Sequence, residues 1–108
     1  MKVQVKYTGF AATPSIKAHI AKRMGAIERV IQRYEEEGDL LLSIEVAKST
    51  KHHKRGEVFY AEITIVLPGQ ALRAEHTDLN IFQAINKAQE MLKGRLRKYK
   101  TTHIKYSS

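Results

Sequence analysis

Lysines and arginines gather in two stretches of the chain, where their spacing suits the binding of phosphate groups. Residues 48–55 (KSTKHHKR) hold four of these cations and no acid, and residues 87–105 hold seven cations and one acid. These stretches carry charges of +4 and +6, so the remaining residues carry −2 of the net charge of +8. An uneven distribution of this kind favours a polyanionic partner, while a merely solvated face is the alternative.

The candidate phosphate-binding residues come from these stretches and from the outward side of the first predicted helix. They are Lys22, Arg29, Lys51, Lys54, Arg55, Lys87, Lys93, Arg95, Arg97, Lys98 and Lys100. Aromatic residues make up only 7% of the chain, which weakens any mechanism based on stacking of single-stranded bases. We therefore expect recognition of the phosphate backbone of double-stranded or folded RNA, with an affinity that falls steeply with salt.

Residues for catalysis, cofactors or metals do not form recognisable patterns. The chain has no cysteine, its five histidines show no HxxxH or HExxH spacing, and its serines lie in no GxSxG turn. Phosphate-binding glycine loops are also absent. We expect no enzyme, no cofactor, no metal and no small-molecule substrate. Protonation of His52 and His53 would raise the charge of their loop in an acidified cell, and two ordinary loop histidines are the alternative.

The length of 108 residues fits one domain, which we place at residues 1–100, followed by a short flexible tail at residues 101–108. No stretch approaches the 18 apolar residues of a membrane span, and the first residues lack the apolar region of a signal peptide. The composition predicts a cytoplasmic, basic, globular protein without a membrane partner.

Two amphipathic helices must present the cations. The first opens at Thr13-Pro14, a capping residue followed by a proline that needs no donor, and the acidic run 35–37 with Gly38 ends it. The second opens at Asn80, with Asp78 as the competing cap. The apolar positions predicted to be buried are Ile16, Ile20, Met24, Ile27, Ile31 and Tyr34 on the first helix, and Ile81, Ile85, Ala88, Leu92, Leu96 and Tyr99 on the second.

Four strands complete the pattern, at residues 1–7, 40–47, 57–67 and 70–76. The first alternates apolar and polar residues in the way of a half-buried strand, and Pro68-Gly69 predicts a turn between the last two. A helix between the first two strands implies a parallel pair, and hairpins make the other pairs antiparallel. The order β-α-β-β-β-α predicts an α+β two-layer sandwich, with a four-stranded mixed sheet and both helices on one face.

Three stretches of the chain resemble the ribosome hibernation factors, a family also called ribosome-associated inhibitor A or sigma-54 modulation proteins. The first is TPSI at residues 13–16 with Ile20, residues 22–24 and Ile27. The second is LRAE at residues 72–75. The third is NIFQAIN at residues 80–86, with Leu92, Leu96 and RKYK at residues 97–100. The three stretches follow the order of the family and span nearly the whole chain.

The resemblance implies a fold like that of double-stranded-RNA-binding domains and a single-domain short form of the family. It also implies a non-enzymatic translation inhibitor that occupies the mRNA and tRNA channel of the small ribosomal subunit by contacting rRNA. Matching contact positions are Lys22 or Arg23 on the first helix, and Lys98 and Lys100 on the second. We expect a protein that is monomeric off the ribosome.

Two positions depart from the pattern of the family, because Met91 and Gly94 stand where the family has a lysine and an arginine. The register of contacts on the second helix is therefore open, and Lys87, Lys93 or Arg95 could supply the missing charge. Two alternative functions also remain: a general module for structured RNA outside the ribosome, and a small regulatory domain that binds other proteins.

Overall fold

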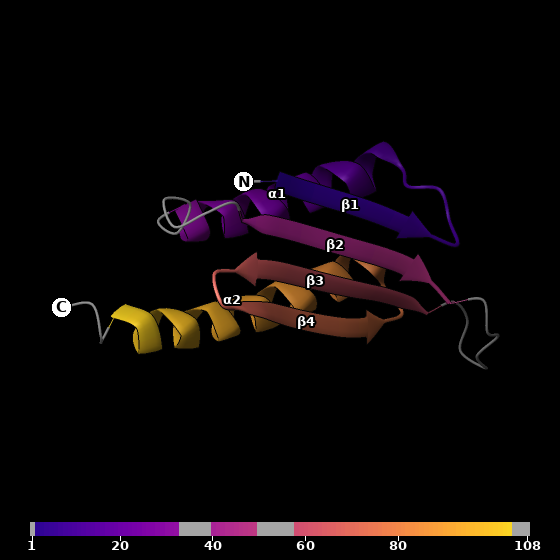
Figure 1. Ribbon diagram of the computed structural model, residues 1–108. Helices are drawn as coiled ribbons and strands as arrows, with labels where there is room; N and C mark the ends of the chain where they lie inside the picture. Colours follow the sequence, from indigo (N-terminus) through magenta and orange to yellow (C-terminus); the bar gives the residue numbers. More distant parts are fainter. Residues whose placement is uncertain (1, 33–39, 50–57, 105–108) are drawn as a thin grey trace.

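The computed structural model describes residues 2–32, 40–49 and 58–104, with side chains described as far as residue 100. The elements follow the order β-α-β-β-β-α (Figure 1). They are β1 (Lys2–Thr8), α1 (Pro14–Ile31), β2 (Leu41–Lys48), β3 (Phe59–Leu67), β4 (Gln70–Asp78) and α2 (Ile81–Ile104). Each strand begins and ends within two residues of the bounds expected from the sequence.

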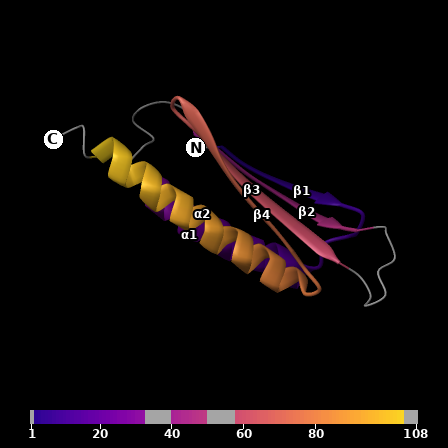
Figure 2. The same ribbon diagram turned by 90° about the horizontal axis from the view of Figure 1, so that it is seen from below.

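The four strands form one mixed sheet in the order β1-β2-β3-β4. The β1–β2 pair is parallel, and the β2–β3 and β3–β4 pairs are antiparallel. Seen along the sheet, both helices lie on the same side of it, and the other side is uncovered (Figure 2). The structure thus confirms the expected α+β architecture, including the parallel crossover through α1.

Both helix starts follow from their capping residues. The Thr13 side chain accepts a hydrogen bond from the backbone N–H of Ile16 (3.2 Å), and Pro14 opens α1. Asn80 Oδ1 accepts from the backbone N–H groups of residues 82 and 83 (2.9 and 3.2 Å), and the Asp78 side chain accepts from the N–H of Asn80. Asn80 is therefore the cap of α2, and the competing Asp78 holds the cap in place.

The core lies between the sheet and the two helices. Strand β2 contributes Leu42, Ile44 and Val46 to it, and β3 contributes every second residue from Ala61 to Leu67. All the expected stripe residues of both helices are buried in it except Tyr34, which lies outside the described residues.

The expectation of a half-buried first strand is wrong. Val3 and Val5 pair with buried residues of β2, so they point to the helix side, yet they are 40% and 42% exposed. The reason is position, because α2 packs against β3 and β4, and β1 is the strand at the opposite edge of the sheet. The alternation of the sequence shows which side chains share a face, and it does not show whether that face is covered.

The second helix is longer than expected. Helix α2 continues through Ile104, so residues 101–104 are helical where the sequence favoured a tail, and residues 105–108 lie outside the described part. Thr101 and Thr102 have low helix propensity, but no glycine or proline interrupts the hydrogen-bond ladder after Gly94. Neither α1 nor α2, as described, is long and apolar enough to cross a membrane.

Candidate nucleic-acid interface

The two helices carry most of the charge in the described part of the molecule. Their residues 14–31 and 81–100 contain ten lysines and arginines against two glutamates, Glu28 and Glu90. We call the outward surface of α1 and α2 the helical face. Two carboxylates cannot neutralise ten cations, so this face keeps a large positive excess whichever local ion pairs form.

A polar seam joins the two helices beneath the helical face. Arg23 Nη1 donates to Gln89 Oε1 (3.1 Å), and Gln89 Nε2 donates to the backbone carbonyl of Arg23 (3.1 Å). One step along, His19 Nε2 lies 2.7 Å from Asn86 Oδ1, and the His19 ring meets the ring of Phe82 edge-on. These contacts set how α1 and α2 lie against each other, and they thereby position the cations on both helices.

Within this seam, Arg23 has a structural task that the sequence did not reveal. Its side chain is half-buried against Gln89, which is only 1% exposed, and its Nε is buried without a hydrogen-bond partner among the described residues. In the sequence, this contact is indicated only by Gln89, a polar residue within the apolar stripe of α2 that needs a hydrogen-bond partner when buried. Arg23 thus contributes to the interface between the helices, whatever it contributes to binding.

Three of the candidate cations lie fully on the outward surface. Lys22 and Arg29 are exposed on α1, and Arg29 Nε donates weakly to the carbonyl of Gly25 (3.4 Å). Lys87 is exposed on α2, where its Nζ is 3.9 Å from Glu90 Oε2. An exposed pair of this length contributes little to stability, so Lys87 can exchange Glu90 for another anion at small cost.

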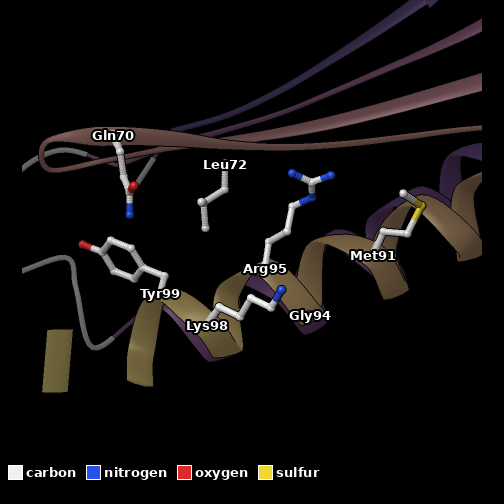
Figure 3. Close-up of a pocket in the computed structure, with 7 residues that line it drawn as sticks. All are labelled: Gln70, Leu72, Met91, Gly94, Arg95, Lys98 and Tyr99. Carbon is white, nitrogen blue, oxygen red and sulfur yellow. The ribbon is translucent and has the colours of Figure 1, made fainter. Parts of the chain in front are cut away.

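The remaining cations of α2 divide between two sides of the helix. Lys93 and Lys100 follow Asn86 at seven-residue spacing, so they continue the side of α2 that faces α1. Arg95 instead projects toward β4, and the Lys98 side chain runs along α2 toward Gly94 (Figure 3). Arg97 is exposed between the two groups. The cations near the end of α2 therefore include two groups with different neighbours.

Beside Arg95 and Lys98 is a cavity of about 690 Å³ between α2 and β4. Its lining residues are Gln70, Leu72, Met91, Gly94, Arg95, Lys98 and Tyr99 (Figure 3). Met91 and Gly94, the two departures from the family pattern, both belong to this lining. Met91 is 42% exposed, and a methyl group at Gly94 would meet only the end of the Arg97 side chain, at 4.0 Å.

The basic loop lies outside the described residues. Lys51, Lys54, Arg55 and the pair His52-His53 all fall within residues 50–57. The described ends of the loop are held together, because the N–H of Ser49 donates to the carbonyl of Val58 (2.8 Å). The contribution of these loop cations and the pH dependence suggested by the two histidines stay predictions.

The uncovered face of the sheet has a different electrostatic character. Cross-strand pairing places Lys6, Glu45, Glu62 and Glu75 in one row across all four strands. Lys6 Nζ lies 3.8 Å from Glu45 Oε2, and Arg73 Nη2 lies 3.4 and 2.9 Å from the carboxylates of Glu62 and Glu75. Each carboxylate in the row therefore has a cation beside it.

A tyrosine hydroxyl separates two of these carboxylates. The Tyr60 hydroxyl lies within hydrogen-bond distance of both Glu62 and Glu75, at 2.6 Å from Glu75 Oε2. Burial and these hydrogen bonds raise the pKa of Tyr60 well above its ordinary value. The hydrogen bond from Tyr60 and the contact with Arg73 lower the pKa of Glu75. The row is thus a satisfied network, and no group of three potential ligands for a metal ion occurs in the described part of the chain.

One curated protein is similar to this chain over most of the chain's length. A curated ribosome hibernation promotion factor from Deinococcus radiodurans is 25% identical over 93 residues, which are 86% of this chain and 46% of that protein. The chain thus spans about half the length of this relative.

Two solved structures share the fold. The N-terminal domain of Thermus thermophilus Protein Y has a TM-score of 0.69 at 22% identity, and the alignment covers 92% of this chain and 99% of that one. A ribosomal subunit interface protein from Coxiella burnetii has the same TM-score at 19% identity, covering 94% and 99%. Residues 3–103 also match the family described as sigma 54 modulation protein / S30EA ribosomal protein. This match covers nearly the whole chain, which therefore belongs to that family.

Proposed function

We propose that this chain is a non-enzymatic inhibitor of translation that binds the small ribosomal subunit through its helical face. In this proposal it occupies the mRNA and tRNA channel in the cytoplasm, contacts rRNA and is monomeric off the ribosome. The observation that carries the proposal is the excess of ten cations over two carboxylates on the helices of a member of this family. A relative named as a hibernation promotion factor and a fold neighbour named as a subunit interface protein support the same partner.

The electrostatics of the helical face suit rRNA for a general physical reason. Each lysine or arginine that neutralises a phosphate releases condensed counterions, and this release makes the binding favourable and dependent on salt. Lys22, Lys87 and Arg97 are exposed on the outward surface, so they can reach phosphates without rearrangement of the fold. The polar seam keeps α1 and α2 side by side, which suits recognition of an RNA shape rather than of one strand.

The uncovered sheet face supports folded RNA over single-stranded RNA as the ligand. Proteins that stack bases on a sheet need exposed aromatic rings there. Among the described outward side chains of this sheet the aromatic one is Tyr60, and its hydroxyl is engaged by Glu62 and Glu75. The sheet therefore offers no stacking platform in its described part, and the helical face is left as the binding surface.

Co-sedimentation with small ribosomal subunits tests the proposal. We expect binding that weakens steeply between 50 and 200 mM salt, by about a thousandfold if six phosphates are contacted. Replacement of Arg97, Lys98 and Lys100 together by glutamate is expected to abolish binding at physiological salt. If this variant binds as tightly as the parent protein and unfolds at the same urea concentration, the end of α2 is not the binding surface.

Competition experiments separate the ribosomal function from the alternatives. We expect initiator tRNA and mRNA to displace the protein from small subunits, because all three would share one channel. Binding to folded RNA without such competition would indicate a general RNA-binding module instead. Failure to bind any RNA at low salt would indicate that the cations meet an acidic protein partner.

A further inference from the structure

A groove lies between β4 and α2. The sheet and α2 diverge toward the turn between β3 and β4 (Figure 2), and the cavity of about 690 Å³ lies between them. Its volume is in the range of sites that enclose a few side chains of a ligand. Leu72 of β4 and Met91 and Tyr99 of α2 supply apolar surface.

The charges at this groove have one sign. Arg95 and Lys98 are exposed, and the Arg95 side chain projects from α2 toward β4 (Figure 3). The lining residues include no aspartate or glutamate. The groove therefore complements a ligand that combines apolar side chains with carboxylates.

Strand β4, beside the groove, can also bind a ligand through the backbone N–H and C=O groups of its free edge. β4 is at the edge of the sheet and pairs with β3 on one side, so its other side has no strand neighbour in the described structure. Such an edge binds extended peptides by adding a strand, with affinity from main-chain hydrogen bonds and specificity from pockets for alternate side chains. Gln70 and Leu72, on the helix side of β4, line the groove directly below this edge.

Two lining residues have no evident structural task and make the groove accessible. Met91 is 42% exposed on a helix whose other large apolar residues are mostly buried. Gly94 lies in the interior of α2, where glycine costs helix stability, and open space rather than close packing lies in front of it. The flexible thioether of Met91 is exposed beside Gly94, which has no side chain, so this surface can adapt to the shape of a partner.

We propose that the groove between β4 and α2 binds an extended acidic peptide segment of a partner protein. The peptide adds to the edge of β4, places apolar side chains beside Leu72, Met91 and Tyr99, and pairs its carboxylates with Arg95 and Lys98. The groove shares Arg95 and Lys98 with the cations of α2 that are candidates for RNA binding, whereas Lys22, Lys87 and Lys93 do not line it.

The test uses the whole chain and a fluorescein-labelled eight-residue peptide in which leucine and glutamate alternate. Fluorescence anisotropy is expected to show binding that is at least tenfold tighter than that of a peptide with lysine in place of each glutamate. Gly94→Leu fills the groove, and we expect it to weaken binding of the acidic peptide at least fivefold. Because leucine is the better helix former, the urea midpoint of this variant stays equal or rises, so the loss does not reflect unfolding.

Gly25→Leu is the matched control. Gly25 is also inside a helix with no atom within 4 Å of an added methyl group, but it lies on α1, away from the groove. We expect it to leave peptide binding unchanged. Amide resonances of residues 70–73 should shift on binding, whereas those of β1, the other edge strand, should not.

Three results would overturn the proposal. The first is equal affinity for the acidic and basic peptides, or no binding of either at millimolar concentration. The second is equal loss of binding in the Gly94→Leu and Gly25→Leu variants. The third is tighter binding of a labelled octauridine that is also lost in Gly94→Leu, because the groove would then be a nucleic-acid site.

Discussion

The helical face and the uncovered sheet face carry charge in opposite ways. On the sheet, the outward charged side chains of the described strands are three cations and three glutamates, and each glutamate forms an ion pair with a lysine or arginine. On the helices, ten cations have only two carboxylates within their own elements. The outward charges of the sheet face sum to zero, whereas the helical face has a positive excess that the carboxylates of its own helices cannot neutralise.

This difference separates charges that serve the fold from charges that serve a partner. A network such as Glu62, Glu75 and Arg73 with Tyr60 satisfies its members inside the molecule, and removal of a member is expected to change stability. An unbalanced face stabilises nothing by itself and costs self-repulsion, so its removal is expected to change binding. Each of the following changes tests one side of this distinction.

The largest difference is expected between a variant that loses two charges from the helical face and one that loses two charges from the sheet face. Lys87→Gln with Lys93→Gln should weaken binding to small ribosomal subunits about 30-fold, or about 2 kcal/mol, and reduce the salt slope by about 2. Lys2→Gln with Lys6→Gln removes the same charge from the sheet face and should change affinity less than threefold. Sedimentation across a salt series measures both, and equal losses would show that only the net charge of the molecule matters.

The second effect concerns the polar seam that holds the helical face together. Gln89→Ala removes the hydrogen bonds that the Gln89 side chain makes with Arg23 Nη1 and with the Arg23 carbonyl, and the free energy of unfolding should fall by about 1–2 kcal/mol. Gln83→Ala, at an exposed position of the same helix, is the control and should stay within about 0.5 kcal/mol. Urea unfolding measures both variants. Equal stability of the two would mean that the seam contributes nothing beyond packing.

The third effect concerns the sheet network and its pH dependence. Tyr60→Phe removes the hydroxyl between Glu62 and Glu75 and should cost about 0.5–1 kcal/mol of stability near neutral pH. Tyr60 has a raised pKa, so its contribution is present below about pH 10 and is lost as the pH rises. Glu75 has a lowered pKa, so its contribution is present above its ordinary value of 4.5 and is lost as the pH falls.

The difference in stability between the parent protein and Tyr60→Phe should therefore be widest between about pH 6 and pH 9. Thermal unfolding across a pH series measures it. Ribosome binding should not change, because the substitution removes no charge from the helical face. A difference that stays constant from pH 4 to pH 11 would contradict the coupled network.

The sequence was sufficient for the order of the elements and for most of the core. Period-two strands, the caps Thr13 and Asn80, and two apolar helical stripes are local signals, and the structure confirms them. The exposure of Val3 and Val5 could not be foreseen, because it depends on which strands the helices cover.

The candidate surface was less predictable than the fold. The list of cations came from two basic stretches, from the first predicted helix and from the family resemblance, but their division between the side toward α1 and the groove depends on how α2 packs against β4. The Arg23–Gln89 contact depends on the relative position of two helices, and the row from Lys6 to Glu75 depends on the register of all four strands. Such long-range pairings are not visible in the periodicity of any single element.

The smallest effect tests whether charge alone accounts for binding by the helical face. Gly25→Ala places a methyl group in open space within α1, at a position whose backbone is not strained for alanine. The free energy of unfolding should therefore rise by about 0.5 kcal/mol. Affinity for small subunits should stay within twofold, because no charge is lost. A marked loss of affinity in this more stable protein would mean that the RNA backbone approaches α1 closely at Gly25, and that shape contributes to binding alongside charge.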